Sequence, residues 1–547
     1  MEENQILTFP AVFKETVRKH PNENALAFTG EKPITYAELN QQILALISFL
    51  EKLQIHSGDK VAILSTNMPN WGAVYLAITF MGAVAVPLLP DFHPEEIENI
   101  LNHSESKAIF ASKGLLSKLK EIKVSTLEFR CCLEDFKVCQ PDKRHIQFNP
   151  SATPVRTYSV KEDDLAALFY TSGTTGKSKG VMLTHKNICF TAHKGRRVQY
   201  VDEKDRFLSV LPLSHTYENT IGFILPMMCG SCIYYLDKPP TPSVLLPVLQ
   251  QVKPTMMLTV PLIIEKIYRN RVLPSFTSKK LIGILYNIPF FRKKLNLLAG
   301  KKLKETFGGK LKFYGIGGAK LDPAVEKFLI EARFPYAIGY GLTETSPLLA
   351  GVNPRTVRLG STGPAVEEVE LKIHDPNPDT GEGEIWAKGP NVMKGYYKEP
   401  GLTNQVITSD GWFRTGDLGV FDKDRFLYIK GRSKNVIVMP GGENIYPEEI
   451  ESVINNFHFV LESLVVEKKG KLVALVHFNQ EELEKHYKYL KEEVINYVER
   501  RKEELSKELH AYVNSRVNKF SRLQSIISQP YPFQKTATQK IKRFLYQ

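Results

Sequence analysis

The feature that most constrains this chain is a glycine- and hydroxyl-rich stretch at residues 171–181, which has the sequence TSGTTGKSKGV. The apolar run LAALFY at residues 165–170 precedes it and predicts a short buried strand. The residues that follow, MLTHKN at 182–187, are typical of the entrance to a helix. The glycines allow a tight turn that brings backbone N–H groups close to an anion, and the hydroxyls and lysines add donors and positive charge. The stretch therefore predicts a phosphate-binding loop.

Two other interpretations of this stretch fit less well. A P-loop requires a glycine five positions before its Gly-Lys-Ser/Thr. Here Gly176, Lys177 and Ser178 are present, but Thr171 stands where the first glycine is needed. A flexible surface linker does not usually follow a buried strand or carry two lysines and a run of hydroxyls.

A second long segment, WGAVYLAITFMGAVAVPLL at residues 71–89, is apolar, uncharged and long enough to span a bilayer. Gly82 and Pro87 interrupt it, and its end favours a strand. We therefore expect a buried helix that turns into a buried strand, within the protein core. The N-terminus, MEENQILTFPAVF, has acidic residues where a signal peptide has basic ones, which predicts no export.

The six cysteines show no spacing typical of a disulfide framework. Cys229 and Cys232 form a single CxxC without the second pair or the histidines of a zinc site, so we expect buried thiols there. This cysteine usage predicts a cytoplasmic, reduced protein.

The formal charge of +13 is partly local, because residues 266–304 contain no acidic residue. Lysines and arginines in this stretch alternate with large apolar side chains such as Ile284, Phe290 and Phe291. Such a stretch fits the anionic inner face of a membrane, and it fits equally a solvated insertion with a few core anchors. Nucleic acid is disfavoured as a partner, since no nucleic-acid-binding motif accompanies the charge.

Alternating helix and strand signals between residues 10 and 160 predict an α/β architecture. Apolar residues recur at helical spacing over residues 36–53, and KVAIL at 60–64 predicts a strand. The same order follows in EEIENILNHS at 95–104 and KAIFAS at 107–112.

Polar side chains with the chemistry of nucleotide binding lie in GYGLTETSP at residues 339–347. Tyr340 offers an aromatic face to a purine, Thr343 a hydroxyl to phosphate, and Glu344 a hard oxygen to Mg²⁺, which needs only one or two carboxylates beside phosphate. A helix cap formed by the threonine and its acidic neighbour fits the same letters.

Two further polar residues permit both a structural and a functional interpretation. Asp417, after Thr415-Gly416, is placed to accept both hydroxyls of a ribose, but many such aspartates only cap turns. His215 lies after a strand-like run in FLSVLPLSHTYE at 207–218, and a lone histidine in such a place is usually a hydrogen-bonded structural residue.

In their order along the chain these motifs resemble those of the AMP-forming acyl-CoA synthetases, relatives of the luciferases and of peptide-synthetase adenylation domains. The stretch 171–181 matches almost letter for letter, LPLSHTYE matches LPLxHxxE of the long-chain branch, and PFQKTATQKIKR at the C-terminal end matches PKTxTGKIxR. The resemblance covers nearly the whole chain. It implies an α/β fold with a large N-terminal domain of mixed sheets sandwiched by helices (1–431), a hinge (432–434) and a small mobile α+β C-terminal domain (435–547).

The resemblance also implies a role for each matching residue. Lys540 is the mobile catalytic lysine, Lys434 is the hinge residue, and His215 lies by the substrate carboxylate and the acyl pocket. Glu344, helped by Thr171, holds Mg²⁺. The implied ATP-binding residues are Thr171, Ser172, Gly173, Thr174, Thr175, Gly176, Lys179, Gly317, Gly318, Ala319, Tyr340, Gly341, Thr343, Asp417 and Arg432. The sequence departs from the family pattern at Ser178 (usually proline), Leu262 (more often arginine) and Gln539 (usually glycine).

The implied reaction uses ATP, Mg²⁺ and coenzyme A: a carboxylate attacks the α-phosphate of ATP, and a thiol then displaces AMP from the acyl-AMP. LPLSHTYE and the basic, apolar stretch at 266–304 point to a long-chain fatty acid as the substrate. An acyl-carrier-protein synthetase or a fatty acyl-AMP ligase would share every ATP-binding residue. Ser178 and Gln539 permit a non-catalytic lipid- or nucleotide-binding relative, and the intact Glu344, Asp417 and Lys540 argue against it.

Overall fold

The computed structural model describes residues 6–140, 146–172, 178–277, 280–439, 444–479, 483, 494–536 and 540–547. The chain divides into two compact units. Unit 1 contains the described residues of 1–372, 386–414 and 422–428, and unit 2 those of 373–385, 415–421 and 429–547. The chain therefore passes between the two units several times before it remains in unit 2.

The first sheet of unit 1 has eight strands in the order β15-β14-β13-β12-β10-β11-β1-β2, of which β1 and β10–β14 run parallel. Neighbouring residues along a strand point to opposite faces, so Phe207 and Met256 join one core while Leu208 and Met257 join another. The strands are β1 (Asn24–Phe28), β2 (Ile34–Thr35), β10 (Arg206–Ser209), β11 (Cys232–Tyr235), β12 (Met256–Thr259), β13 (Phe313–Ile316), β14 (Tyr336–Tyr340) and β15 (Ala350–Gly351).

The second sheet also has eight strands, in the order β18-β9-β8-β4-β3-β5-β6-β7. Its central strands pair in parallel, as expected for the alternating helices and strands of the first 160 residues. The strands are β3 (Lys60–Leu64), β4 (Val84–Leu88), β5 (Ser106–Ala111), β6 (Phe129–Cys132), β7 (Val138–Gln140), β8 (Leu165–Ser172), β9 (Ser178–Thr184) and β18 (Gly395–Tyr396).

A helix begins within MLTHKN at residues 182–187, as predicted, but the first three of these residues still belong to strand β9. β8 and β9 form an antiparallel hairpin whose register runs from Leu165↔Thr184 to Ser172↔Ser178, so the chain stays extended through Thr184. The buried side chains of Val181 and Leu183 alternate with less buried ones, which is the period of a strand. Helix α5 (His185–Val198) begins only after Thr184, whose hydroxyl caps it by accepting the Asn187 N–H at 3.1 Å.

Residues 71–89 form a buried helix followed by a buried strand, as predicted. Helix α3 (Pro69–Phe80) is apolar on all sides and is buried on all sides, which is the pattern of a helix in the middle of a core. Gly82 turns the chain into β4 at φ +75°, a conformation that a side chain would strain. Among the described residues, no helix is both long enough and apolar enough to cross a bilayer.

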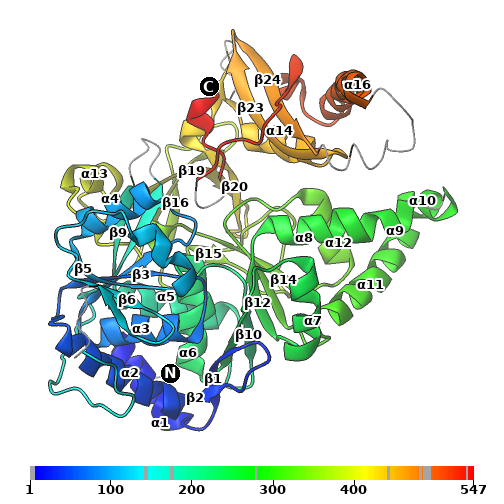
Figure 1. Ribbon diagram of the computed structural model, residues 1–547. Coiled ribbons are helices and arrows are strands. Elements are labelled where there is room, and N and C mark those ends of the chain that lie inside the picture. The colour runs from blue at the N-terminus through cyan, green and yellow to red at the C-terminus, as the bar shows by residue number, and fades with distance from the viewer. Residues whose placement is uncertain are drawn as a thin grey trace. The chain divides into compact units, whose positions relative to one another are not determined.

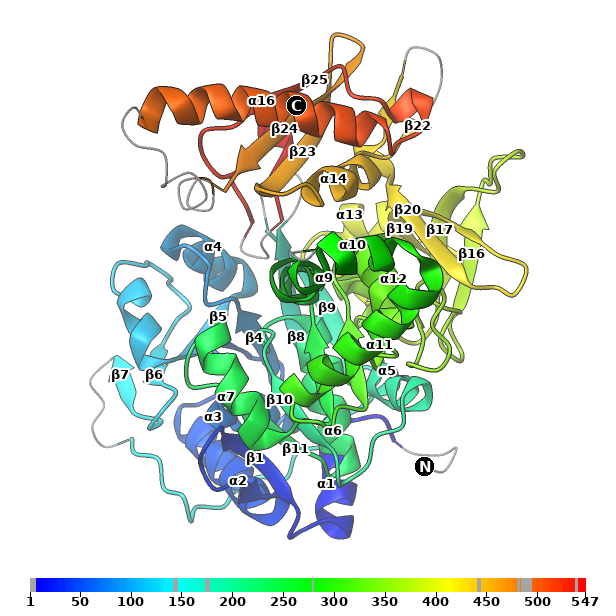
Figure 2. The ribbon, with the colours of Figure 1, turned by 90° about the vertical axis from the view of Figure 1, so that its right-hand side faces the viewer.

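The other helices of unit 1 cover the two sheets (Figures 1 and 2). α7, α8, α11 and α12 pack on one face of the first sheet, while α3, α6 and the π-helix η2 lie between the two sheets. They are α1 (Phe9–Lys19), α2 (Tyr36–Lys52), α4 (Pro94–Ser104), η1 (Lys113–Leu119), η2 (Glu218–Ile224), α6 (Leu225–Cys229), α7 (Pro242–Val252), α8 (Pro261–Ile267), η3 (Tyr268–Val272), α9 (Leu273–Thr277), α10 (Lys280–Asn287), α11 (Pro289–Thr306), α12 (Pro323–Glu331), η4 (Thr343–Thr345) and α13 (Pro400–Val406).

A four-stranded sheet, β16-β17-β19-β20, contributes residues to both units: β16 (Glu370–His374), β17 (Gly383–Lys388), β19 (Phe413–Phe421) and β20 (Leu427–Arg432). Unit 2 continues with η5 (Ser433–Asn435), β21 (Ile437–Val438), β22 (Asn444–Ile445), α14 (Pro447–Asn455), β23 (Val460–Lys468), β24 (Lys471–Phe478), α16 (Val494–Asn514), η6 (Lys519–Ser521), β25 (Ser525–Ser528) and η7 (Arg543–Leu545). Figure 2 shows α16 lying along the sheet of β23, β24 and β25.

All six cysteines are free thiols. Cys229 and Cys232 are buried, as the sequence predicts for an isolated CxxC. Cys139, on β7, is the one exposed cysteine of the six.

Candidate active site

The hairpin β8–β9 brings the two ends of the glycine-rich stretch together. Thr171 pairs with Lys179 in the strand register, and Ser172 pairs with Ser178. Gly180 lies beneath the ring of Tyr170, where an added Cβ would come within 3.1 Å of a ring atom. The predicted phosphate-binding residues Gly173, Thr174, Thr175 and Gly176 lie outside the described residues, as does Lys177.

The hairpin and the predicted metal-binding glutamate meet through one tyrosine. The Nζ atom of Lys179 lies 5.1 Å from the centre of the Tyr396 ring. The hydroxyl of Tyr396 donates a hydrogen bond to Glu344 Oε1 at 2.9 Å and so orients this half-buried carboxylate. No motif singled out Tyr396 beforehand, and its position on β18, paired with β9, explains how it reaches the site.

Glu344 and its neighbours stand at the end of a parallel strand. Tyr340 is the last residue of β14, and Thr343 and Glu344 lie in the short helix η4 that follows. Gly341 has no alternative there, because a Cβ would lie 1.6 Å from the carbonyl oxygen of Pro347. In open α/β sheets ligands bind at the carboxyl ends of parallel strands, and this segment has that position.

Gly317, Gly318 and Ala319 follow β13, the strand beside β14. Gly317 is buried, and a Cβ there would come within 3.0 Å of the Tyr217 ring. Gly318 has φ +85° and, like Ala319, is exposed. These three predicted ATP-binding residues and the Tyr340–Glu344 segment thus lie at the same edge of the sheet.

A single glutamate is a sufficient protein ligand for Mg²⁺ when phosphate oxygens supply the rest. Within the described part of the chain no group of three or more histidine, cysteine, aspartate or glutamate side chains is placed to hold a metal ion by itself. The oriented carboxylate of Glu344 therefore suits a cation that arrives with a nucleotide.

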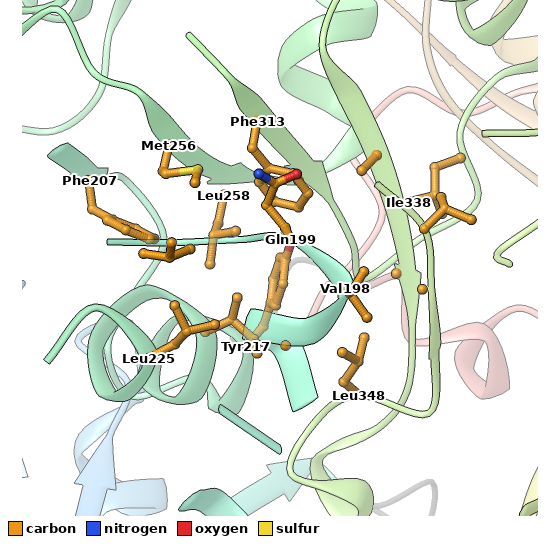
Figure 3. Close-up of a pocket in the computed structure, with 18 residues that line it drawn as sticks. Val198, Gln199, Phe207, Tyr217, Leu225, Met256, Leu258, Phe313, Ile338 and Leu348 are labelled. Carbon is orange, nitrogen blue, oxygen red and sulfur yellow. The ribbon is translucent and has the colours of Figure 1, made fainter. Parts of the chain in front are cut away.

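An apolar pocket adjoins the Tyr340–Glu344 segment, because Gly339, the residue before Tyr340, lines it. Strands β10, β12, β13 and β14 form one wall of it, and α5, η2 and α6 form the other (Figure 3). Gln199 and Tyr217 are the lining residues with polar side chains. The lining residues are Gly195, Val198, Gln199, Val201, Phe207, Tyr217, Ile221, Leu225, Met256, Leu258, Phe313, Gly315, Ala337, Ile338, Gly339, Leu348, Gly351 and Val352.

His215 precedes the pocket wall by two residues. It is half-buried in the turn that joins β10 to η2, and its backbone N–H donates to the carbonyl of Pro212 at 2.9 Å. Tyr217, rather than His215, lines the pocket, and the place for a Gly315 Cβ is 2.8 Å from the Tyr217 hydroxyl.

The turn that carries His215 is connected to a buried carboxyl group, that of Glu218. Glu218 is 2% exposed, and Ser209 donates a hydrogen bond to its Oε1 at 2.5 Å. Burial raises the pKa of Glu218 to about 8, so it is protonated at neutral pH. Asn67 donates to Ser209 Oγ at 2.9 Å and accepts the Leu213 N–H at 2.8 Å, which connects the buried acid to the turn that carries His215.

In unit 2 the two predicted ribose-binding residues form an ion pair. Arg432 Nε lies 2.7 Å from Asp417 Oδ1, and the Asp417 carboxylate is largely buried. The Asp417 N–H donates to Thr415 Oγ1 at 3.1 Å, while Arg432 Nη1 donates to the Thr415 carbonyl at 3.3 Å. The structure therefore brings together residues that are separated by a turn and a strand.

The remaining predicted residues also lie in unit 2. Lys434 is exposed in η5. Lys540 is exposed, and its carbonyl accepts the Thr536 N–H at 2.8 Å. Gln539, which departs from the family pattern, lies outside the described residues.

Comparisons with known proteins agree with these features. The sequence model of a family described as AMP-binding enzyme matches residues 13–397. The peroxisomal long chain acyl-CoA synthetase 6 of Arabidopsis thaliana is 33% identical over 467 aligned positions, which cover 78% of this chain and 66% of that protein. The chloroplastic long-chain-fatty-acid–[acyl-carrier-protein] ligase AEE15 of the same plant is 28% identical, over 87% of this chain and 77% of that protein.

Among solved structures, O-succinylbenzoate coenzyme A synthetase of Bacillus subtilis, in complex with ATP and a magnesium ion, has a TM-score of 0.75. The match covers 97% of this chain and 98% of that chain at 24% identity, which establishes the likeness of the fold. The fold class expected from the motifs is thereby confirmed. Because the family model spans well over half of the sequence, this chain belongs to the family of AMP-binding enzymes.

Proposed function

We propose that this protein is an AMP-forming ligase that activates a long-chain fatty acid with ATP and Mg²⁺ and transfers the acyl group to coenzyme A. Membership of the AMP-binding family supports the adenylation chemistry, and the relative named a long chain acyl-CoA synthetase supports the substrate and the acceptor. An acyl carrier protein is the alternative acceptor, because another relative is named as a ligase for that protein.

The observation that carries the choice of substrate is the apolar pocket. Its wall ends at Gly339, next to the Tyr340–Glu344 segment that is expected to hold the nucleotide. An aliphatic chain gains free energy when it leaves water for such a wall, at roughly 0.8 kcal/mol per buried methylene. A small polar acid would find few partners there besides Gln199 and Tyr217.

In the first half-reaction the carboxylate oxygen of the fatty acid attacks the α-phosphorus of ATP, and the bond to pyrophosphate breaks. A carboxylate is a competent nucleophile at neutral pH, so the protein acts by positioning and by offsetting charge. In this proposal the β8–β9 hairpin holds the phosphates, Asp417 and Arg432 bind the ribose, and Lys540 offsets the negative charge that develops. Glu344, held by Tyr396, would hold Mg²⁺, which neutralises phosphate charge when bound.

In the second half-reaction the sulfur of coenzyme A attacks the acyl carbon, AMP leaves, and the thiol proton is released. We propose that rotation at Lys434, within the hinge 432–434, carries Lys540 away between the two half-reactions and turns another face of the small domain 435–547 toward domain 1–431. In this proposal the face that approaches coenzyme A includes residues 441–444, of which 441–443 lie outside the described residues. His215 is assigned to the substrate carboxylate because its turn leads directly into the pocket wall at Tyr217.

The test is pyrophosphate release from Mg-ATP with fatty acids of graded length, with and without coenzyme A. The proposal expects release with long chains and a thioester only when coenzyme A is added. Acyl-AMP that transfers only to an acyl carrier protein would identify the alternative acceptor. No release with any acid would contradict the proposal and favour a protein that binds lipid or nucleotide without turnover.

The membrane contact suggested by residues 266–304 also belongs to this proposal. The buried face of α11 is set by Arg292, which pairs with Glu331 at 2.9 Å, by Asn296, and by Gly300, where a Cβ would lie 2.2 Å from the Ala332 carbonyl oxygen. This spacing of four residues directs the other side of the helix outward.

The outward side of α10 and α11 combines apolar and basic side chains. Ile284, Phe290 and Leu298 are 65%, 60% and 67% exposed. Lys294 lies 4.5 Å from the centre of the Phe290 ring, and Lys301 is exposed one turn beyond Leu297. We propose that this surface rests on an anionic bilayer, at the cytoplasmic side that the cysteine content suggests.

Sedimentation with lipid vesicles tests this contact. The wild-type protein should sediment with vesicles that contain phosphatidylserine, less so as salt is raised, and poorly with phosphatidylcholine alone. The variant Phe290→Ser/Leu298→Ser should lose this binding, whereas Leu359→Ser, which removes an exposed leucine elsewhere in unit 1, should keep it. Equal sedimentation of both variants would contradict the assignment of this surface.

A further inference from the structure

Lys540 lies on the second of two short antiparallel arms near the C-terminal end of unit 2. Lys535 and Ile541 form an isolated antiparallel β-bridge, and the Thr536 N–H donates to the Lys540 carbonyl at 2.8 Å. A single pair of such short strands is only marginally stable by itself. The position of the Lys540 ammonium group therefore depends on what anchors the two arms.

The arm before Lys540 is anchored on strand β23. Phe533 is buried against a small apolar cluster that includes Leu464 and Val466, and its N–H donates to Glu462 Oε1 at 2.9 Å. The other carboxylate oxygen of Glu462 lies 2.5 Å from Lys535 Nζ. This arm thus has an apolar anchor as well as an ionic one.

The arm after Lys540 is anchored on helix α14. Arg543 Nη2 binds Glu451 Oε2 closely and lies 3.8 Å from Glu448 Oε1. Glu448 and Glu451 are three residues apart, which places them on one face of the helix. Glu451 is 8% exposed, and its Oε1 accepts the Val465 N–H at 2.7 Å, so the acceptor of Arg543 is itself fixed between helix and sheet.

The same helical turn also holds the segment proposed as the hinge. Asn435, next to Lys434 in η5, donates a hydrogen bond to Glu448 Oε1 at 2.7 Å. Asn435 and Arg543 therefore approach the same carboxylate oxygen from two distant parts of the chain.

We propose that Arg543 is a positioning residue that fastens the arm of Lys540 to α14, so that the hinge segment, α14 and the catalytic lysine move as one body. The inference deepens the proposed function and rests on the role given there to Lys540. Arginine suits this place better than lysine, because its planar guanidinium can serve two carboxylates at once and is never neutral. Without it, the arm after Lys540 would keep its apolar contacts through Ile541 and Tyr546 but would lose its attachment to α14.

The test measures the two half-reactions separately, as pyrophosphate release with fatty acid and ATP, and as thioester formation from preformed acyl-AMP and coenzyme A. Arg543→Met should slow the first by about tenfold to a hundredfold, the range expected when a reacting group is misplaced by about 1 Å. The second should remain within about twofold of wild type, since Lys540 serves the first half-reaction. Arg543→Lys should recover part of the loss.

A double variant distinguishes positioning from general damage to the fold. If Arg543 acts through Lys540, then Arg543→Met added to Lys540→Ala should cause no further loss of adenylation. Lys542→Met, which removes a positive charge from the adjacent residue, is the matched control and should behave as wild type. Equal losses in both half-reactions, or additive losses in the double variant, would overturn the inference. If Lys540→Ala alone leaves adenylation intact, the proposed role of Lys540 fails instead.

Discussion

Glu218 in unit 1 and Glu451 in unit 2 are both buried glutamates, but within the described chain only Glu451 is paired with a cation. Glu218 receives a hydrogen bond from Ser209, its other oxygen has no hydrogen-bond partner among the described residues, and burial raises its pKa to about 8. Burial also raises the pKa of Glu451, but Arg543 acts against this rise. The first carboxyl group has no cation from the described part of the chain beside it, whereas the second is paired with one. A carboxyl group without a cation stabilises only its immediate surroundings, whereas a carboxylate paired with an arginine can hold a distant segment in place.

The largest expected difference between Glu218 and Glu451 appears in the pH dependence of the protein's stability. Between its ordinary pKa of 4.5 and its folded pKa of about 8, Glu218 keeps its proton in the folded protein and loses it in the unfolded chain. The folded state then binds more protons, so stability falls as the pH rises through this window. Glu218→Gln should remove this loss, which is of the order of 4 kcal/mol between pH 5 and pH 8.

Melting temperatures of wild type and Glu218→Gln across this range provide the measurement. The two curves should diverge as the pH rises, with the variant the more stable at pH 8. Glu128→Gln, at an exposed glutamate, is the matched control and should track the wild type. Parallel curves for all three proteins would show that Glu218 is ionised at neutral pH and would remove the contrast with Glu451.

Glu451→Gln is expected to have the next largest effect. It leaves Arg543 without its close counter-charge, and breaking a mostly buried ion pair costs about 3 kcal/mol. The melting temperature of unit 2 should fall at neutral pH, and adenylation should slow while thioester formation from preformed acyl-AMP persists. A variant that melts as wild type and adenylates at the normal rate would mean that the Arg543 pair is no anchor.

Ser209→Ala should have the smallest effect. It deletes the hydrogen bond to Glu218 and the one from Asn67, each worth about 1 kcal/mol. Because the bond from Ser209 lowers the pKa of Glu218, its loss should raise this pKa and extend the fall of the melting curve to higher pH. Thermal melting from pH 5 to pH 9 checks both the drop and the shift. A shift to lower pH would contradict the described direction of this bond's effect.

The fold was predictable where one segment carries its own signal. The apolar run at 71–89 specified its buried helix and strand, because both the length and the interruption at Gly82 lie within it. The helix entrance at 182–187 was predictable because the cap at Thr184 is a short-range signal, whereas the strand β9 that leads into it depends on pairing with β8, which no single segment reveals.

The motifs of the candidate site were predictable from the sequence, but the residues that line its pocket and position its side chains were not. The pocket draws its wall from α5, η2, α6 and four strands, whose lining residues are spread from Gly195 to Val352 along the chain. Tyr396 reaches Glu344 across 52 residues, and Arg543 reaches Glu451 across 92. Such partners are chosen by the three-dimensional path of the chain, so residue type and spacing cannot identify them.

The distribution of the thiols makes the proposed domain movement accessible to fluorescence. Five of the six cysteines are buried, and only Cys139, on the edge strand β7 of unit 1, is exposed. A maleimide dye should therefore label the native protein at one place without removal of any other cysteine. A second thiol introduced at the exposed Leu461 in unit 2 would accept a partner dye. Energy transfer between the two dyes would then report changes in the distance between the proposed domains 1–431 and 435–547 as ATP, fatty acid and coenzyme A are added in turn.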